Sequence, residues 1–217
     1  MGLCISCRGK TASREIGYLV EFASIESVTI AKFCDKARFE DQCKNGCHNY
    51  ARKWSCPPHS PSYEELAGEW GRLYVSLFQI EMGQFGYIKN DYLKIKAANR
   101  ILKSRADRFL RHISNTKKCF IISTGSCQLC KPCKCKLHEP CKHPDEMAYS
   151  FEAIGVNVGL LVEHCFEKEL LWYKRGYLPK YTSVVVGLLS NDSISLERLK
   201  NDYLQIEPYT QIEPYMK

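Results

Sequence analysis

The chain has 217 residues, enough to bury a hydrophobic core of its own. Hydrophobic residues make up 45% and charged residues 25%, which are ordinary globular values and exclude an intrinsically disordered chain. Because no apolar run approaches the roughly 18–20 residues of a membrane-spanning helix and no secretory signal opens the chain, we expect a cytoplasmic protein without a membrane span. The formal net charge of +7 is compatible with an acidic partner or RNA but identifies neither.

Thirteen cysteines set this chain apart from an average globular protein. Their odd number, their clustering within short stretches and the lack of an export signal disfavour a framework of disulfides. Clustered thiols in a cytoplasmic protein are typical of metal binding, so we treat them as candidate metal ligands.

The first part of the chain contains one expected strand and a first group of cysteines. Residues 16–31 are apolar and β-branched toward their end, which predicts a short strand near Val28. The stretch CKNGCHNYARKWSCPP then combines an Asn-Gly turn signal with an extended Cys-Pro-Pro exit. A tight thiol pair followed by Cys-Pro is typical of a ligand set. The candidate ligands of this group are Cys43, Cys47 and Cys56, with Cys34 less firmly placed because it lies nine positions before Cys43.

A short helix and a buried strand follow the first cysteine group. Ser62 as N-cap and Glu65 at the capping-box position predict a helix that reaches about residue 70. The apolar run 72–80 predicts a buried strand.

Residues 91–113 are predicted to form a long helix that begins at Asn90 or Asp91. Its expected buried face consists of Leu93, Ala97, Ile101, Phe109 and Ile113. The opposite face is basic and consists of Lys94, Lys96, Arg100, Lys103, Arg105, Arg108 and Arg111. Such a face is ordinarily solvated; as a binding surface, it suits an acidic redox partner, and RNA is the less favoured partner.

A strand at residues 117–124 leads directly into the main cysteine loop, GSCQLCKPCKCKLHEPCKHP, residues 125–144. The Cys-x2-Cys-x2-Cys run resembles the opening of the bacterial ferredoxin signature, in which thiolates two residues apart bind an iron–sulfur cube. The candidate ligands of this second group are Cys127, Cys130, Cys133 and Cys141, with Cys135 as a spare.

The last third of the chain is predicted to contain two helical pieces, 146–154 and 157–167, the second with Asn157 as its N-cap. A buried strand at 181–189 and a final helix, which begins at Ser193 or Ser195 and reaches about residue 203, follow. Three apolar strands separated by helices favour an α/β fold: a small, at least partly parallel sheet with flanking helices and two cysteine-rich loops. We divide the chain into an N-terminal segment (1–27), a single α/β domain (28–204) and a tail (205–217) in which QIEPY occurs twice.

These residues resemble a predicted metal-binding family catalogued as domain of unknown function 2284, from about Val28 to about Leu189. The family pattern contains Cys–Cys–Tyr–Trp-Ser-Cys-Pro-Pro, then Gly-x-Cys-x2-Cys-x2-Cys, Pro-Cys with a nearby proline, and Ser-x-Glu-Ala-x-Gly. It often has Tyr-Gly where this chain has Tyr50-Ala51, and Cys135 is extra to it. The resemblance implies metal binding and no particular activity. The positions that carry it here are Cys43, Cys47, Tyr50, Trp54 to Pro58, Gly125, Cys127, Cys130, Cys133, Pro140, Cys141, Pro144 and Ser150 to Gly155.

Counting ligands leaves three functions open. Two [4Fe-4S] clusters need eight cysteines if each cube is fully held, and the protein would then carry electrons. A cube held by three cysteines has one open iron, which suits an enzyme of reduction or sulfur removal with proton donors among His48, His59, His138, His143 and Glu139. Zinc in place of iron would make the chain a zinc-stabilised binding module.

Overall fold

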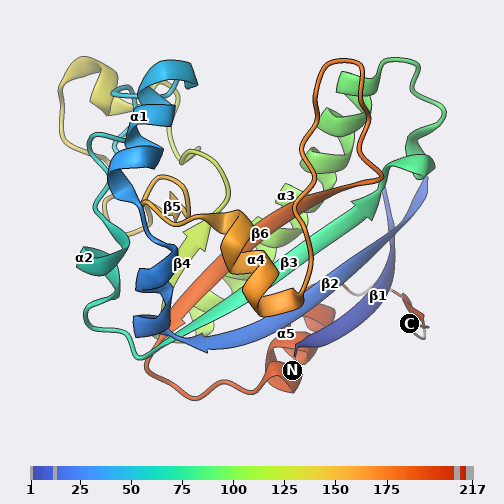
Figure 1. Ribbon diagram of the computed structural model, residues 1–217. Coiled ribbons are helices and arrows are strands. Elements are labelled where there is room, and N and C mark those ends of the chain that lie inside the picture. The colour runs from blue at the N-terminus through green and yellow to red at the C-terminus, as the bar shows by residue number, and fades with distance from the viewer. Residues whose placement is uncertain (1, 12–13, 208–210, 214–217) are drawn as a thin grey trace.

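A single seven-stranded sheet organises the computed structural model, which describes residues 2–11, 14–207 and 211–213. The strand order is β5-β4-β6-β3-β2-β1-β7 (Figure 1). The β4–β5 pair is parallel and the other pairs are antiparallel, which confirms an α/β fold with a partly parallel sheet. The strands are β1 (Leu3–Lys10), β2 (Glu15–Glu26), β3 (Arg72–Glu81), β4 (Phe120–Ser123), β5 (Tyr149–Ser150), β6 (Tyr181–Ser190) and β7 (Gln211–Glu213).

The three strands expected from apolar runs are β3, β4 and β6, and their order explains how the sheet is connected. β6 lies between β3 and β4 and is antiparallel to both. β3 and β4 therefore run in the same direction without touching, and the long helix between them crosses over one strand. The parallel pair arises one position further out, where β5 adds to the edge of β4 through Ile122 with Tyr149 and Ser123 with Ser150.

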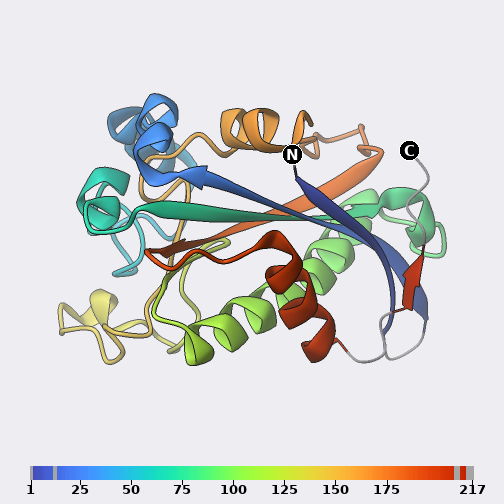
Figure 2. The ribbon, with the colours of Figure 1, turned by 90° about the horizontal axis from the view of Figure 1, so that it is seen from below.

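Helices cover both faces of the sheet (Figure 2). One face packs against α3 (Asp91–Thr116) and α5 (Leu196–Ile206). The other face packs against the 3-10 helix η1 (Ser27–Phe33), α2 (Tyr63–Ala67) and α4 (Val158–Phe166). The remaining helical elements are α1 (Lys36–Gly46), η2 (Met82–Phe85) and η3 (Lys134–Leu137).

β3 shows why its sequence is apolar almost without interruption. Tyr74 and Phe78 point into the core beneath α3, whereas Leu73, Val75 and Leu77 point into the core beneath α4. Successive side chains of a strand face opposite sides of a sheet, so a central strand between two helical layers buries both sets.

The predicted helix starts are confirmed by their caps. Ser62 and Glu65 form the reciprocal capping box of α2, and the Asn90 side chain accepts the amide of Leu93 at the start of α3. Asn157 and Ser195 cap α4 and α5 in the same way. Side-chain caps satisfy amides that a helix cannot pair internally, so they are the local signals that a sequence states most clearly.

The predicted faces of α3 are only partly correct. Phe109 and Ile113 are buried as expected, but Leu93 is 52% exposed and Arg105, assigned to the basic face, is buried. The buried set also includes Ile95, Ala98, Leu102, Ala106 and Leu110, so the apolar stripe is wider than predicted and displaced around the helix.

Two predicted elements are wrong. The strand expected near Val28 is β2, which ends at Glu26; Val28 lies in η1 with 78% of its surface exposed. The pairing of β2 with β3 ends just after β2, where the Ser27 amide donates to the carbonyl of Gly71, the residue before β3. Residues 146–154 do not form the expected helix. Tyr149 and Ser150 pair with the edge strand β4 as β5, and a turn follows them.

β1 and α1 had no counterpart in the sequence analysis. β1 and β2 hydrogen-bond within the same sheet as β3, so residues on both sides of position 27 share that sheet. Of the tail, residues 211–213 pair with β1 as β7, and the Pro-Tyr part of each QIEPY copy lies outside the described residues. The division into segment, domain and tail stays a prediction. None of the described helices has the length and apolarity to cross a membrane.

Candidate metal centre

The first cysteine group lies at the end of α1 and in the turns that follow it. Cys43 is in the last turn of α1, and the Cys47 amide donates to its carbonyl (2.9 Å). Burial raises the pKa of the Cys56 thiol to about 11, the Ser55 hydroxyl opposes the rise, and nearby Cys47 and Cys43 add to it. The structure therefore brings Cys43, Cys47 and Cys56 within electrostatic range of one another.

The second cysteine group begins where β4 ends, at the carboxyl edge of the β4–β5 parallel pair. Burial raises the pKa of Cys127, the Leu129 amide lowers it, and Cys130 and Cys141 raise it further. Cys133 directly precedes η3, and Cys135, within η3, is buried. Cys127, Cys130 and Cys141 thus lie near one another, and Cys133 lies near Cys135.

Four hydrogen bonds join the two cysteine loops. The Lys53 ammonium donates to the Cys127 carbonyl (2.6 Å), and the Cys127 amide donates to the Ser55 hydroxyl (3.0 Å). The Trp54 indole donates to the Glu139 carbonyl (3.0 Å), and the Cys135 thiol donates to the Ala51 carbonyl (3.7 Å). Residues 51–55 are therefore fastened along residues 127–139, and the two cysteine groups adjoin.

Lys53 acts on both groups. Its ammonium lowers the pKa of Cys56 and that of Cys127, although burial is the larger influence on each thiol. A cation between two sets of thiols stabilises their deprotonated form, which is the form that binds metal. Neither this role nor that of Ser55 was predicted, because their partner lies more than 70 positions away in the sequence.

A second lysine holds α1 in place. The Lys36 ammonium donates to the Ala153 carbonyl (2.6 Å), to the Ser60 carbonyl and hydroxyl (both 2.9 Å) and to the Pro61 carbonyl (3.2 Å). Lys36 begins α1 and Cys43 is near its end, so these bonds attach the helix that carries the first cysteines to the scaffold on both sides of the second loop. The sequence marks Lys36 with no recognisable signal.

The stretch Ser150 to Gly155 forms the socket for α1. The Ser150 hydroxyl accepts the Ala153 amide, and the Ala153 carbonyl accepts the Lys36 ammonium. At Gly155 the backbone has φ 87°, and a Cβ there would lie 2.7 Å from Cα of Lys36. A glycine is required because the start of α1 occupies the space of a side chain.

Cys34 and Cys135 stand apart from their groups. The Cys34 thiol donates to the Ile30 carbonyl (3.4 Å), and burial, followed by the charge of Glu64, raises its pKa to about 11. Cys34 thus packs beside α2 and η1, whereas Cys135 is turned toward Ala51. Cys119 and Cys165 pack against the two cores, and Cys7 is buried in β1.

The two cysteine loops adjoin, but their thiols do not form a ready metal-binding group. Within the part of the chain that the structure describes, no three side chains of His, Cys, Asp or Glu are grouped so that they hold a metal ion. Of the candidate proton donors, His59 contacts Trp54 with the two rings tilted by 60°, His143 lies 3.4 Å from Glu146, and His138 follows η3.

Residues 26–188 match the model of a family described as a predicted metal-binding protein, DUF2284. The chain belongs to this family. The match spans both cysteine groups, α3 and the socket for α1. No curated protein and no solved structure matches this chain.

Ala51, at the junction of the two cysteine loops, has an unusual backbone conformation. Ala51 adopts φ 53°, in the left-handed region where glycine is unstrained. Its amide donates to the Pro57 carbonyl (2.8 Å) and its carbonyl accepts the Cys135 thiol, so both loops hold it in that conformation. Glycine would suit this backbone better than the alanine found here.

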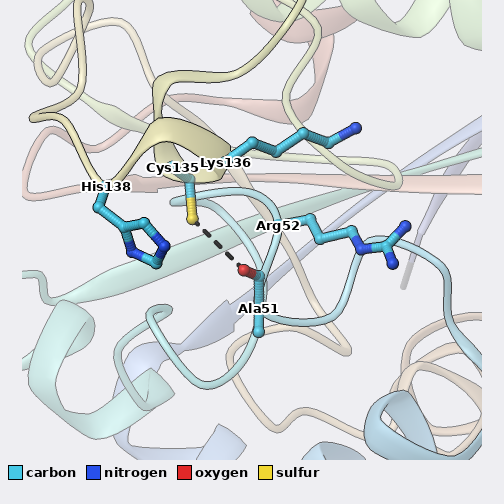
Figure 3. Close-up of a pocket in the computed structure, with 5 residues that line it drawn as sticks. All are labelled: Ala51, Arg52, Cys135, Lys136 and His138. Carbon is cyan, nitrogen blue, oxygen red and sulfur yellow. Dashed lines mark hydrogen bonds between the residues drawn. The ribbon is translucent and has the colours of Figure 1, made fainter.

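A cavity of about 290 Å³ opens where the loops meet (Figure 3). Cys135 reaches from η3 toward the Ala51 carbonyl, and Arg52, Lys136 and His138 complete the lining, with the Arg52 and Lys136 side chains extending away from this contact. The lining is basic, so the junction of the two loops favours anions.

Proposed function

We propose that the two cysteine groups of this metal-binding protein hold two [4Fe-4S] clusters and that the protein carries electrons to a partner enzyme. The observation that supports this function best is the set of hydrogen bonds that fastens residues 51–55 to residues 127–139. An electron carrier with two centres needs them adjacent and rigidly supported, and these bonds serve that need.

The donor set fits iron–sulfur clusters in number and chemistry. Thiolates are the ligands that such clusters require, and each loop offers at least three. Cys43, Cys47 and Cys56 would hold one cluster, and Cys127, Cys130, Cys133 and Cys141 the other. Cys34 or Cys135 would be the fourth ligand beside Cys43, Cys47 and Cys56. Alternatively, Cys141 would be that ligand, and Cys135 would replace it beside Cys127, Cys130 and Cys133. When bound, such clusters take up and release single electrons without bond making.

The residues around the thiols would support this role. Lys53 between the loops, with Lys131, Lys134, Lys136 and Lys142 in the main loop, offsets the negative charge of thiolates and favours a reduced centre. The lysines also create a positive field that attracts an acidic partner.

The ion pairs of α3 favour one side of the helix for the proposed partner. Lys94 pairs with Asp91, Arg111 pairs with Asp107, and Arg108 pairs with Glu207. Lys96, Arg100 and Lys103 remain exposed, and Lys103 lies beside Gly125 at the start of the main loop. An acidic redox partner would therefore dock on the Lys103 side of α3 together with the loop lysines, and its affinity would fall with ionic strength.

A second function rests on the Cys135 contact. If Cys135 keeps its bond to Ala51 and the cluster beside it is held by three cysteines, one iron is open to a substrate. The adjoining cavity would then bind an anionic substrate through Arg52 and Lys136, with His138 as proton donor. Such an enzyme would catalyse a reduction or remove sulfur from its substrate.

The test is to purify the protein without oxygen and measure iron, sulfide, zinc and the visible spectrum together. We expect roughly eight irons per chain and a brown absorbance that dithionite bleaches. Cys56→Ser should lose about half of the iron, because it removes a ligand of one cluster only. Cys119→Ser is the matched control, since that thiol packs against the core, and it should keep the full content.

Three outcomes decide between the functions. An iron content that is unchanged in Cys56→Ser, or reduced equally in Cys119→Ser, contradicts the assignment of ligands. A spectrum that shifts with added cyanide in the wild-type protein favours the open-site enzyme over the electron carrier. Zinc without iron or sulfide would exclude both redox functions and leave the zinc-stabilised binding module.

A further inference from the structure

A second basic cavity, of about 360 Å³, lies between the end of β1 and the middle of α3. The end of β1, which lines it, is at the opposite end of the molecule from the main cysteine loop (Figures 1 and 2). We propose that this cavity binds a small phosphate monoester. The site goes beyond the proposed electron transfer and does not depend on it.

The lining of the cavity carries an excess of positive charge. Among the described residues of the lining, Lys10, Arg100, Arg105 and Arg108 contribute cations and Glu207 the one carboxylate, which leaves three positive charges unbalanced. Lys10 also lies 3.9 Å from Glu15, but both side chains are exposed, so this pairing is weak. An excess of this size within one small cavity favours a ligand with two negative charges over a carboxylate with one.

The buried Arg105 is the strongest evidence for a binding site in this cavity. Its guanidinium is buried over the ring of Tyr18 (4.7 Å to the centroid), and one Nη donates to the Lys10 carbonyl (3.5 Å). Its Nε is 3.9 Å from Glu207 and, among the described residues, has no hydrogen-bond partner. A buried charged donor without an acceptor costs free energy, so the charge of an anion in the adjoining cavity would stabilise this guanidinium.

Gly9 lets the guanidinium reach this place. A Cβ on Gly9 would lie 2.4 Å from Nη2 of Arg105, so any side chain there would push the arginine away. The end of β1 and the arginine of α3 thus fit each other only with glycine at this position.

The rest of the lining suits a phosphate ester. Arg100, Ser104 and Arg108 follow one another at intervals of four residues, so they lie on one face of α3. Guanidinium groups bind phosphate oxygens in pairs, and the hydroxyls of Ser104 and Thr11 add donors. The volume is at the lower end for small-molecule sites, which favours a small ester whose organic part contacts Ile101 over a dinucleotide.

The test is calorimetric titration of the full-length, anaerobically purified protein at low salt with glycerol 3-phosphate, and with glycerol as the uncharged probe. We expect saturable binding of the ester and none of glycerol. Arg100→Gln should weaken binding about tenfold, because one charge-assisted contact is lost from an exposed residue that the fold does not need. Lys10→Gln, from the other wall of the cavity, should act in the same direction.

Lys96→Gln is the matched control. It removes the same charge from an exposed position of α3, one turn before Arg100 and outside the cavity, and should change the dissociation constant less than twofold. Equal weakening by Lys96→Gln and Arg100→Gln would show a diffuse field instead of a site and overturn the proposal. Absence of saturable binding of the ester, or binding of a short single-stranded RNA alone, would overturn it as well.

Discussion

Ala51 shows how much one residue contributes to the junction of the two cysteine loops. It bonds to Pro57 through its amide and to Cys135 through its carbonyl, and it holds φ 53° to do so. A left-handed conformation costs an ordinary residue about 1 kcal/mol relative to glycine. This chain therefore keeps a strained alanine where both loops determine the backbone.

Ala51→Gly should raise the free energy of unfolding by about 1 kcal/mol, because glycine adopts this conformation without strain. Urea unfolding of the metal-free protein measures the change. Ala37→Gly, at an exposed site inside α1, is the control and should lower stability by about 1 kcal/mol. If the two variants shift stability in the same direction, the strain assigned to Ala51 is absent.

At the scale of elements, α1 is the piece that connects the cysteines to the sheet. None of its own side chains is buried, so hydrophobic packing does not hold it. The Lys36 ammonium holds it to carbonyls of the scaffold, and the Asp35 amide donates to the Gly155 carbonyl (2.8 Å). An exposed helix that depends on a few polar contacts at one end is sensitive to any change in that socket.

Gly155→Ala should therefore destabilise the protein by about 2–4 kcal/mol, which combines the left-handed strain with the overlap against Lys36. The measurement is urea unfolding, with hydrogen exchange of the α1 amides as a local readout.

Gly176→Ala separates the two causes. Gly176 has φ 83°, close to that of Gly155, but a Cβ there meets nothing within 4 Å. This variant should lose only about 1 kcal/mol and leave exchange in α1 unchanged. A loss as large as that of Gly155→Ala would mean that the backbone conformation, and not the contact with α1, explains both.

At the scale of the whole molecule, two hydrophobic cores share one sheet. Leu102 of α3 and Leu161 of α4 are fully buried on opposite faces, and β3 contributes side chains to both cores. Neither core persists without the strands that form the other, so the described chain should unfold in one cooperative step.

Leu102→Ala and Leu161→Ala should each lower the free energy of unfolding by about 2–5 kcal/mol, the usual cost of a cavity in a packed core. Far-UV circular dichroism and tryptophan fluorescence should give coincident transitions for both variants. Transitions that separate in either variant would show that the two faces fold independently. That result would favour a different division of the chain from the single domain proposed for residues 28–204.

The sequence alone determined the features that depend on neighbours along the chain. The caps at Ser62, Asn90, Asn157 and Ser195 are local hydrogen bonds, and the apolar runs of β3, β4 and β6 are continuous, so both were predicted correctly. Family membership was also predictable, since the spacing of the cysteines is a property of the sequence.

Only the tertiary structure decided the features that depend on residues far apart. β6 lies between β3 and β4, the charge of Lys53 acts on two thiol groups, and Lys36 contacts Ala153. Each of these features joins positions that are more than 50 residues apart in the sequence. The burial of Arg105 on a face of α3 predicted to be basic has the same origin, because Gly9 of β1 and Tyr18 of β2 contact it from far away in the sequence. Local patterns report the energies of short-range contacts, whereas the junction of the cysteine loops and the basic cavity depend on long-range packing.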